Sequence, residues 1–422
     1  MWLSSAGVAT TQVMRMLREN PDAVDVRIHG TNVERDAPAL SACDVSEVEP
    51  RHVSDDNYAD FALDFCRRHR IDVLIPPRRL AALAGLTDVL AQAGTHLMCS
   101  PPAAIDTLTS KSRTYEEAEA AGIPVPPWRV ASDAASFREA VGELSATGER
   151  VCVKPAGEYS AFGFRILDDR PLRLKDLLAA PAPLASVEAV AHALQRAADE
   201  GETVPELLVM PYLEGPEVSV DCLSAPGGGL LTGIARSKQG RYRYLLDDPA
   251  PVAIARRLVG HFRLAYLSNV QLRHRNGEPV LLEANPRASA GIFQTAFTGV
   301  NLPWAAVRLL LHGDAGPLPA PRLGGRLAIT ETATEVLGAP SLGVPGPTSP
   351  AHTAPAHMAP AHGLPAHGLP AHAVPAPRTS PEADVLLAEV PAVPPATTAA
   401  ATVTTPTPAA ASTPVPAALA AG

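Results

Sequence analysis

The chain has 422 residues and a formal net charge of −9 at pH 7. Its length allows two or more domains with cores of their own, and its acidic balance argues against a general nucleic-acid binder. No run of eighteen apolar residues occurs, which argues against a membrane span. The five cysteines form no CxxC pair and the N-terminus has no basic secretory leader, so we expect a cytoplasmic protein with reduced thiols.

The first hundred residues alternate between helical and strand patterns. A helix is predicted over 9–20, a strand around 25–30, a helix over 58–69, and a second, buried strand over 71–76. The same helix–strand order repeats over 86–94 and 95–100. Strands that alternate with helices indicate βαβ units and a parallel sheet.

The pattern changes from residue 104 onward. We predict helices over 104–121, 132–144 and much of 172–200, and strands at 150–155, 165–168 and twice within 207–224. The segment IARSKQGRYRYLLDD, 234–248, is interpreted as a loop. A hairpin is predicted from 266–274 and 279–286 around Asn276–Gly277, followed by a helix over 301–313.

The C-terminal part differs in composition. From Pro350 the unit PAHxx recurs five times at a spacing of five residues, and proline, alanine and threonine fill most of the remainder. Such a segment buries too little apolar surface to offset its chain entropy. We therefore predict a disordered tail over 341–422, joined to the globular part by a connecting segment, 316–340.

The predicted hairpin carries polar residues on alternate positions. Glu283, Asn285 and Arg287 would share one face of an extended strand. A two-residue turn would put Gln271 opposite Leu282, whereas a three-residue loop with Gly277 bulged would bring it to the Glu283 face. In the second register, Gln271, Glu283 and Asn285 offer the oxygen ligands that Mg²⁺ prefers, and Arg287 offers a fork for a phosphate or carboxylate. Polar residues that simply face solvent are the alternative.

The stretch LLEANPRASAG, 281–291, resembles the signature of the ATP-grasp superfamily. TSKSRTYEEAEAAGIPVP, VCVKPAGEYSAFGFRIL and VMPYLEGPEVSVDCL resemble other segments of that family, in the family's order. The resemblance spans roughly residues 1–315 and points to the carbamoyl-phosphate-synthetase-like, carboxylate–amine ligase branch. It implies an α/β fold: a Rossmann-like pre-ATP-grasp domain over 1–103, then a two-lobed α+β ATP-grasp domain over 104–315. Its small lobe would span about 125–205 and its large lobe about 206–315.

The resemblance also implies roles for individual residues. ATP and Mg²⁺ (or Mn²⁺) would be the cofactors, with Gln271, Glu283 and Asn285 as metal ligands and Arg287 and Lys154 as catalytic residues. The nucleotide would be bound by Lys111, Lys154, Gly157, Ser160, Gly163, Met210, Pro211, Tyr212, Leu213 and Glu217. Met210 and Pro211 stand where many relatives have Gln-Glu or Glu-Lys, so the usual side-chain contact to adenine is missing.

Two basic regions outside the motifs are weaker candidates. Arg236, in the predicted loop 234–248, would contact an anionic substrate, although a solvated surface loop explains it equally well. Arg78 and Arg79 follow a predicted parallel strand, at the end where open α/β sheets bind ligands.

The implied activity is that of an ATP-dependent ligase. A small-molecule carboxylate would be activated as an acyl phosphate and joined to an amine or similar nucleophile, with no nucleic-acid or membrane partner and with a homodimer possible. A non-catalytic nucleotide-binding scaffold and a carbamoyl-phosphate-type kinase are the alternatives. The absence of a P-loop, a G-x-S-x-G elbow and an H-E-x-x-H motif agrees with the ligase, whose chemistry needs no protein nucleophile.

Truncation after about residue 340 tests the predicted tail. We expect unchanged stability and unchanged ATP turnover, because the PAHxx repeat has no hydrophobic period with which to dock on a folded domain. Thermal unfolding and ADP release of the truncated and full chains provide the comparison. A loss of activity on truncation would show that the tail is part of the working enzyme.

Overall fold

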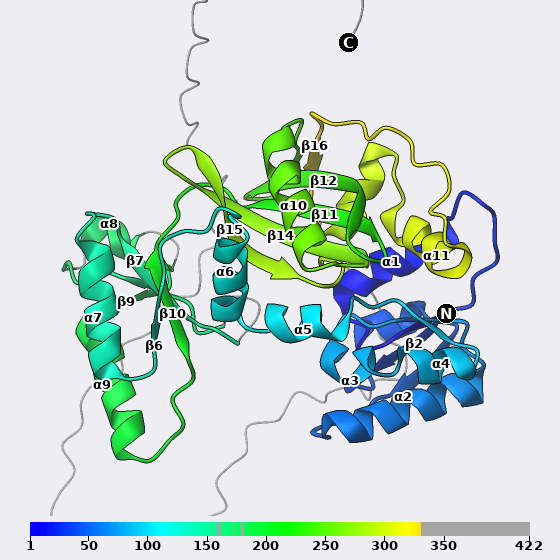
Figure 1. Cartoon of the computed structure of the whole chain (residues 1–422), viewed down its shortest axis with the longest axis horizontal. Coiled ribbons are helices and arrows are strands. Elements are labelled where there is room, and N and C mark those ends of the chain that lie inside the picture. The colour runs from blue at the N-terminus through cyan, green and yellow to red at the C-terminus, as the bar shows by residue number, and fades with distance from the viewer. Residues whose placement is uncertain (158–161, 172, 179–180, 331–422) are drawn as a thin grey trace, which may run out of the picture. The chain divides into compact units, whose positions relative to one another are not determined.

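The computed structural model describes residues 1–157, 162–171, 173–178 and 181–330. The strands of these residues form three sheets, two of five strands and one of six (Figure 1). This confirms the predicted mixed α/β class. The predicted tail, 341–422, lies outside the described residues. None of the helices in the described ranges has the length and apolar character that a membrane span requires.

The first sheet is parallel, in the order β3-β2-β1-β4-β5. Trp2 of the central strand β1 is fully buried and packs on Phe65 of α2, with 4.3 Å between ring centroids. The predicted alternation of strands and helices is therefore observed. The strands are β1 (Trp2–Leu3), β2 (His29–Asn32), β3 (Val45–Val48), β4 (Val73–Ile75) and β5 (His96–Leu97). The helices are α1 (Val8–Arg18), the short 3₁₀ helix η1 (Pro38–Ala42), α2 (Asp55–His69), α3 (Leu80–Ala84) and α4 (Thr87–Gln92).

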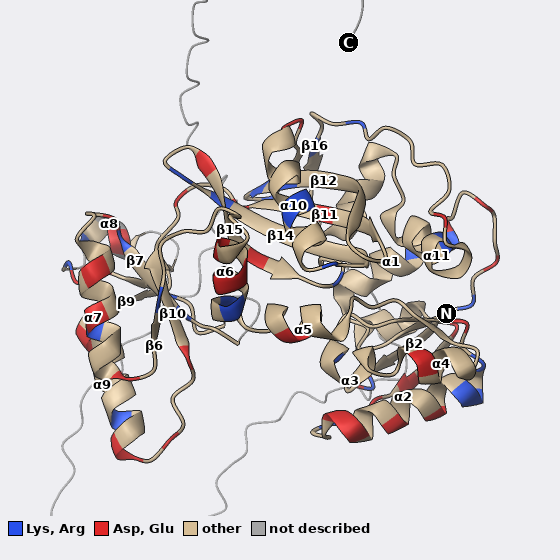
Figure 2. Cartoon of the chain, in the orientation of Figure 1, with Lys and Arg blue, Asp and Glu red and all other residues tan. Residues whose placement is uncertain are grey.

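Helix α2 shows how local sequence fixes these elements. The Ser54 hydroxyl caps the helix by accepting the Asn57 N–H, at 3.2 Å. Acidic residues occupy its first turn and basic residues its last, which complements the helix dipole (Figure 2).

Two helices, and not one, follow this sheet. The predicted helix over 104–121 is divided into α5 (Pro102–Leu108) and α6 (Lys111–Ala120). The division occurs because Ser110 is extended and its hydroxyl accepts the Arg113 N–H as an N-cap. Gly122, at φ +67°, ends α6 as predicted. The break makes Lys111 the first residue of a helix.

The second sheet has the order β6-β10-β7-β8-β9. Helices α7 and α9 cover one face, where Val151 and Val153 of β7 are buried, and Cys152 and Lys154 alternate to the other face. The predicted helical stretch 172–200 is interrupted by a short strand, β9 (Leu184–Ala185), which pairs with β8 (Arg165–Leu167). The elements are β6 (Arg129–Ala131), α7 (Ala134–Ser145), β7 (Val151–Pro155), β8 (Arg165–Leu167), α8 (Leu174–Leu177), β9 (Leu184–Ala185), α9 (Val187–Asp199) and β10 (Leu207–Pro211).

The third sheet is antiparallel, in the order β15-β14-β11-β12-β13-β16. Helix α10 packs on one face; α11 and the 3₁₀ helix η2 pack on one end of the other. The elements are β11 (Val218–Ala225), β12 (Gly229–Gln239), β13 (Tyr242–Leu245), α10 (Pro249–His261), β14 (Tyr266–Arg275), β15 (Glu278–Asn285), η2 (Ile292–Thr298), α11 (Leu302–His312) and β16 (Arg326–Ala328).

The interpretation of residues 234–248 as a loop is wrong. This segment forms the end of β12 and all of β13, which pair from Arg236 opposite Leu245 to Gln239 opposite Tyr242. The basic residues hid the strand pattern, because Arg236 and Lys238, and then Arg241 and Arg243, stand at alternate positions where a half-buried strand would show apolar residues.

The β14–β15 hairpin has the predicted partners but a different turn. Asn276 and Gly277 both have positive φ, 54° and 86°, which is the two-residue turn typical of Asn-Gly. The expected three-residue loop with a bulged Gly277 is therefore wrong. The register shifts further along, where Leu272 opposes Leu281 and Gln271 opposes Glu283, so that Leu282 is the extra residue.

A pair of glycine substitutions tests this turn. Gly277→Ala should lower the free energy of unfolding by about 1 kcal/mol, because alanine is strained at positive φ. Gly142→Ala, on the exposed surface of α7 with no atom within 4 Å of the added Cβ, should raise it by about 0.5–1 kcal/mol. Urea unfolding of the two variants measures both signs, and equal effects would contradict the assigned turn.

Candidate functional site

Polar side chains share one face of the third sheet. In β14, Asn269, Gln271 and Arg273 alternate with the buried Val270 and Leu272. Cross-strand pairing puts residues of β11, β12 and β15 on the same face. These are Ser219 and Asp221, Arg236, and Glu283 and Asn285. Further along the same strands, Leu223, Ile234 and Leu267 are apolar and packed in the core with α11. One sheet face thus changes from an apolar core to a polar region in which Ser219, Asp221, Arg236 and Asn269 are still buried.

The predicted metal ligands are brought together on this face. Gln271 lies directly opposite Glu283, and Asn285 opposes Asn269. The Asn285 amide donates to Glu283 Oε1 at 3.0 Å, and all three predicted ligands are half-buried. One carboxylate and two amides supply oxygen donors of the kind that Mg²⁺ or Mn²⁺ takes. The residues present therefore fit a hard cation.

Arg287 follows the strand and is held near these groups. Its Nη1 donates to the Ala288 carbonyl at 3.0 Å. Burial lowers the pKa of the Arg287 guanidinium, and the Glu283 carboxylate opposes that shift. Arg78, beyond the end of β4, adds to the positive potential at Arg287. Arg287 and Arg78 therefore provide a cationic edge beside the oxygen donors.

The two predicted lysines converge on the same region from different elements. Lys154 is 9% exposed, and its Nζ donates to the Leu282 carbonyl at 3.4 Å. Burial lowers its pKa to about 8; the Lys111 ammonium adds to that effect, and the Glu283 carboxylate opposes it. The Lys111 backbone N–H and its Nζ both donate to the Ala156 carbonyl, at 3.0 and 3.5 Å. Two cations therefore lie near the end of β7.

Of the predicted phosphate loop, Gly157 and Gly163 are described, whereas Ser160 lies outside the described residues. Gly163 has φ +68°, and a Cβ there would meet the Pro155 ring at 2.7 Å. Only glycine fits this position without a shift. Gly163 therefore lies directly against Pro155, at the end of β7.

Two backbone groups of the predicted adenine hinge already form hydrogen bonds within the protein. The Tyr212 N–H donates to the Arg150 carbonyl at 2.7 Å, and the Leu213 carbonyl accepts Arg273 Nη1 at 2.6 Å. The Leu213 N–H has no partner among the described residues. Met210 is buried with its sulfur 3.8 Å from the Tyr115 hydroxyl, so its side chain packs in the core.

Arg273 lies in the candidate site and was missed by sequence reasoning. Its guanidinium bonds the hinge carbonyl, lies 6.0 Å from the Tyr212 ring centroid, and opposes the raised pKa that burial gives Glu217. Its position two residues after Gln271, on the same strand face, was the available signal. Glu217, the predicted ribose contact, therefore lies in the field of a fixed cation.

Arg236 is not in a solvated loop. It is 8% exposed, its Nε donates to Asp221 Oδ2 at 2.7 Å, and its Nη2 donates to Ser289 Oγ at 2.8 Å. Asp221, also missed from the sequence, is fully buried and accepts the Asn269 amide at 2.9 Å. This cluster lies under Gly291, where a Cβ would meet the Arg236 guanidinium at 2.6 Å. Arg236 and Asp221 therefore neutralise each other's charge, and the bond from Arg236 to Ser289 supports the loop after β15.

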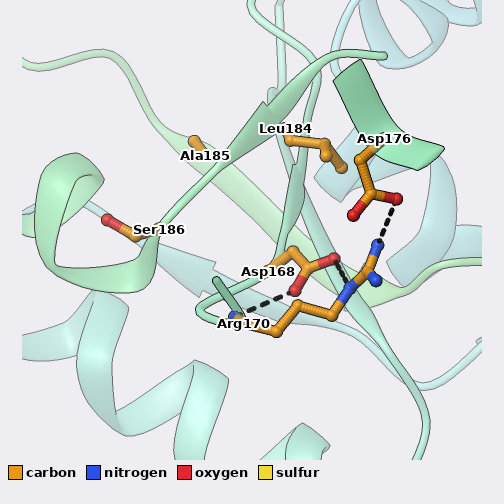
Figure 3. A pocket seen from close by; sticks show the side chains of 6 residues that line it. All are labelled: Asp168, Arg170, Asp176, Leu184, Ala185 and Ser186. Atoms are coloured by element: carbon orange, nitrogen blue, oxygen red, sulfur yellow. Dashed lines mark hydrogen bonds and ion pairs between the residues drawn. The ribbon is translucent and has the colours of Figure 1, made fainter. Parts of the chain in front are cut away.

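A separate pocket lies at the edge of the second sheet (Figure 3). Arg170 occupies it, with its Nε 2.6 Å from Asp168 and its Nη2 3.5 Å from Asp176. Its lining includes none of the predicted site residues. Because its charges are already paired, the polar face of the third sheet is the better candidate site.

Comparison with known proteins shows which sequences and structures this chain resembles. Residues 203–333 match a family model described as ATP-grasp in the biosynthetic pathway with Ter operon. Over 277 residues the chain is 28% identical to the carbamoyl phosphate synthase large chain of Rubrobacter xylanophilus. That match covers 62% of this chain and 25% of the relative, so the chain spans about a quarter of that protein's length.

Solved structures show the same fold. A biotin carboxylase from Campylobacter jejuni in complex with β,γ-ATP has a TM-score of 0.55 at 15% identity, covering 77% of this chain and 74% of that one. An N5-carboxyaminoimidazole synthetase from Staphylococcus aureus has a TM-score of 0.54 at 14% identity, covering 75% and 77%. The predicted resemblance is thereby confirmed: residues 203–333 match an ATP-grasp family model, and the chain resembles a carbamoyl phosphate synthase large chain in sequence and the biotin carboxylase and N5-carboxyaminoimidazole synthetase structures in fold.

Proposed function

We propose that this protein is an ATP- and Mg²⁺-dependent ligase that activates a small-molecule carboxylate as an acyl phosphate and joins it to an amine or similar nucleophile. The observation that carries the proposal is the shared polar face, where Gln271 lies opposite Glu283 and Lys154 reaches the adjacent Leu282 carbonyl. The oxygen donors for a cation and the buried ammonium for a phosphate thus lie beside adjacent residues of β15, Leu282 and Glu283.

Each residue has a distinct part in binding. Gln271, Glu283 and Asn285 would hold the cation, which supplies charge neutralisation at the phosphate oxygens when bound. Lys154 and Lys111 would contact the nucleotide phosphates, and Gly157, Ser160 and Gly163 would cover them. The Leu213 N–H and the Pro211 carbonyl would contact adenine beside Met210 and Tyr212, and Glu217 would contact the ribose.

The chemistry requires positioning more than a protein nucleophile. A carboxylate oxygen of the substrate attacks the γ-phosphorus, the bond to ADP breaks, and an acyl phosphate forms. The amine then attacks the acyl carbon, and inorganic phosphate leaves with the former carboxylate oxygen. Arg287 would stabilise charge that develops on the transferred group. Arg236 is bound to Asp221 and Ser289, so we assign it to shaping the substrate side.

A carbamoyl-phosphate-type kinase is the second candidate, because the sequence match is to a carbamoyl phosphate synthase large chain. In that case bicarbonate or carbamate would be the acid. ADP release measured against a library of carboxylic acids and bicarbonate separates the two. Release that depends on one organic acid supports the ligase, release with bicarbonate alone supports the kinase, and no release with any acid contradicts both.

Removing a proposed metal ligand should weaken metal binding in the presence of nucleotide. Glu283→Ala takes away the carboxylate of a set of three, and we expect Mn²⁺ affinity with ADP to fall by at least about tenfold. Electron paramagnetic resonance of free Mn²⁺ measures this directly. Glu278→Ala, at the exposed turn of the same hairpin, is the matched control and should bind like wild type. Equal Mn²⁺ affinity of the wild type, Glu283→Ala and Glu278→Ala would contradict the assignment of Glu283 as a metal ligand.

Nucleotide affinity should depend on the charge of Lys154. Its pKa is lowered to about 8, so the ammonium is protonated below that pH and neutral above it in the free protein. ADP affinity, measured by calorimetry, should therefore weaken as the pH rises through about 8. Lys154→Arg keeps its charge over this range and should remove that step. An identical pH dependence in both proteins would remove Lys154 from the phosphate site.

A further inference from the structure

The carbonyl of the bulged residue Leu282 is shared by two side chains from different elements. β15 is an edge strand of the third sheet, and its Leu282 carbonyl accepts the Tyr115 hydroxyl at 2.9 Å and Lys154 Nζ at 3.4 Å. The neighbouring Leu281 N–H donates to the Pro124 carbonyl at 2.8 Å. The edge of β15 is therefore held at the bulge by α6, by the segment after it, and by β7.

Tyr115 is the central member of this arrangement. It lies on α6, is fully buried, and packs edge-on against Trp128 with 6.1 Å between ring centroids. Its hydroxyl also lies 3.8 Å from Met210 of β10, and its ring lies 5.7 Å from Lys154 Nζ. Burial raises the pKa of the Tyr115 phenol, so it remains a hydrogen-bond donor throughout the physiological range.

This contact orders a flexible side chain. Lysine has four side-chain carbons and loses considerable rotamer entropy when it is fixed. Among the described residues, the Leu282 carbonyl is the one hydrogen-bond acceptor for Lys154 Nζ, which leaves its other N–H donors for a ligand. The same carbonyl belongs to the extra residue that aligns Gln271 with Glu283. A hydrogen bond that holds the Leu282 carbonyl in place therefore orders the Lys154 ammonium and also stabilises the register of β15 against β14.

We propose that Tyr115 is a positioning residue: by bonding the Leu282 carbonyl it holds Lys154 at the nucleotide phosphates and keeps the register that brings Gln271 opposite Glu283. This inference rests on the proposed nucleotide site. It assigns to α6 a role in which Tyr115 never touches substrate and acts through Lys154 and the bulge.

A double-mutant cycle on ADP affinity tests whether Tyr115 acts through Lys154. Tyr115→Phe keeps the ring and should weaken ADP binding roughly three- to tenfold, the range expected for one lost hydrogen bond. In the Lys154→Met background the same change should have little further effect when ADP binding is measured without a divalent cation, because the ammonium that Tyr115 positions is gone and the register at Gln271 and Glu283 does not contribute. Equal weakening in both backgrounds would assign Tyr115 to general packing and overturn the proposal.

Tyr58→Phe is the matched control for loss of a buried phenol hydroxyl. Tyr58 is 1% exposed and lies on α2, and its hydroxyl interacts with Ser4, Ser5 and Glu49, none of which belongs to the candidate site. We expect its ADP affinity to equal that of wild type in both backgrounds. A loss as large as that of Tyr115→Phe would show that the effect is not specific to the Leu282 carbonyl.

Lysine ordering provides a readout that needs no nucleotide. The chain has four lysines, Lys111, Lys154, Lys175 and Lys238, so their ¹³Cε signals can be resolved by nuclear magnetic resonance after lysine labelling. Lys154 should be ordered in the wild type and should gain mobility in Tyr115→Phe but not in Tyr58→Phe. A Lys154 as mobile as the exposed Lys238 in the wild type would contradict the proposal even if Tyr115→Phe does not fold.

The two readouts separate the two proposals. If the wild type binds no ADP and Lys154 is ordered through Tyr115, the proposed function fails and the positioning role stands. If ADP binds and Lys154 is mobile or indifferent to Tyr115, the positioning role fails and the proposed function stands.

Discussion

The register shift at Leu282 is the constraint on which the candidate site depends. Side chains alternate along a strand, so a slip of one residue would send Glu283 and Asn285 to the opposite face. The bulge places Gln271 opposite Glu283 while the turn at Asn276–Gly277 remains the tight two-residue type. A single extra residue thus reconciles a favourable hairpin turn with a convergent set of oxygen donors. Bulges are used in this way where a side chain must be re-aimed.

The same region collects charged groups that are expensive to bury. An uncompensated charge in a protein interior is destabilising unless it is paired and hydrogen-bonded. Arg236 meets this requirement internally through Asp221, at 2.7 Å. Lys154 does so only in part: its pKa is lowered by burial, and its hydrogen-bond acceptor among the described residues is a neutral carbonyl. A buried ammonium in that condition gains from a bound anion, which is what a nucleotide phosphate would supply.

Much of the fold follows from patterns in the sequence. The alternation in the first hundred residues, the hairpin and the helix over 301–313 were predictable, because hydrophobic period and capping residues agree there. The β12–β13 pair was not predictable, since Arg236 is buried by a partner, Asp221, that is distant in sequence and adjacent only across the sheet. The division of the helix at Ser110 required recognition of a capping serine inside a helical pattern.

The candidate site, like the fold, was predictable only in part from the sequence. The order of Lys111, Lys154 and the hairpin motif was sufficient to nominate them, and the structure brings these lysines and the hairpin to one region. Their assignment to nucleotide and metal remains a proposal. Arg273 could have been found from its position two residues after Gln271. Tyr115 could not, because it bonds the Leu282 carbonyl, and a backbone contact between distant segments leaves no motif.

The most direct test of the account is the fate of a carboxylate oxygen during turnover. With the acid identified, its carboxylate can be labelled with ¹⁸O and the inorganic phosphate released with ADP analysed by mass spectrometry. Acyl-phosphate chemistry predicts one labelled oxygen in each phosphate, because the amine displaces the phosphate together with that oxygen. Unlabelled phosphate formed alongside the joined product, or AMP as the nucleotide product, would contradict the central claim.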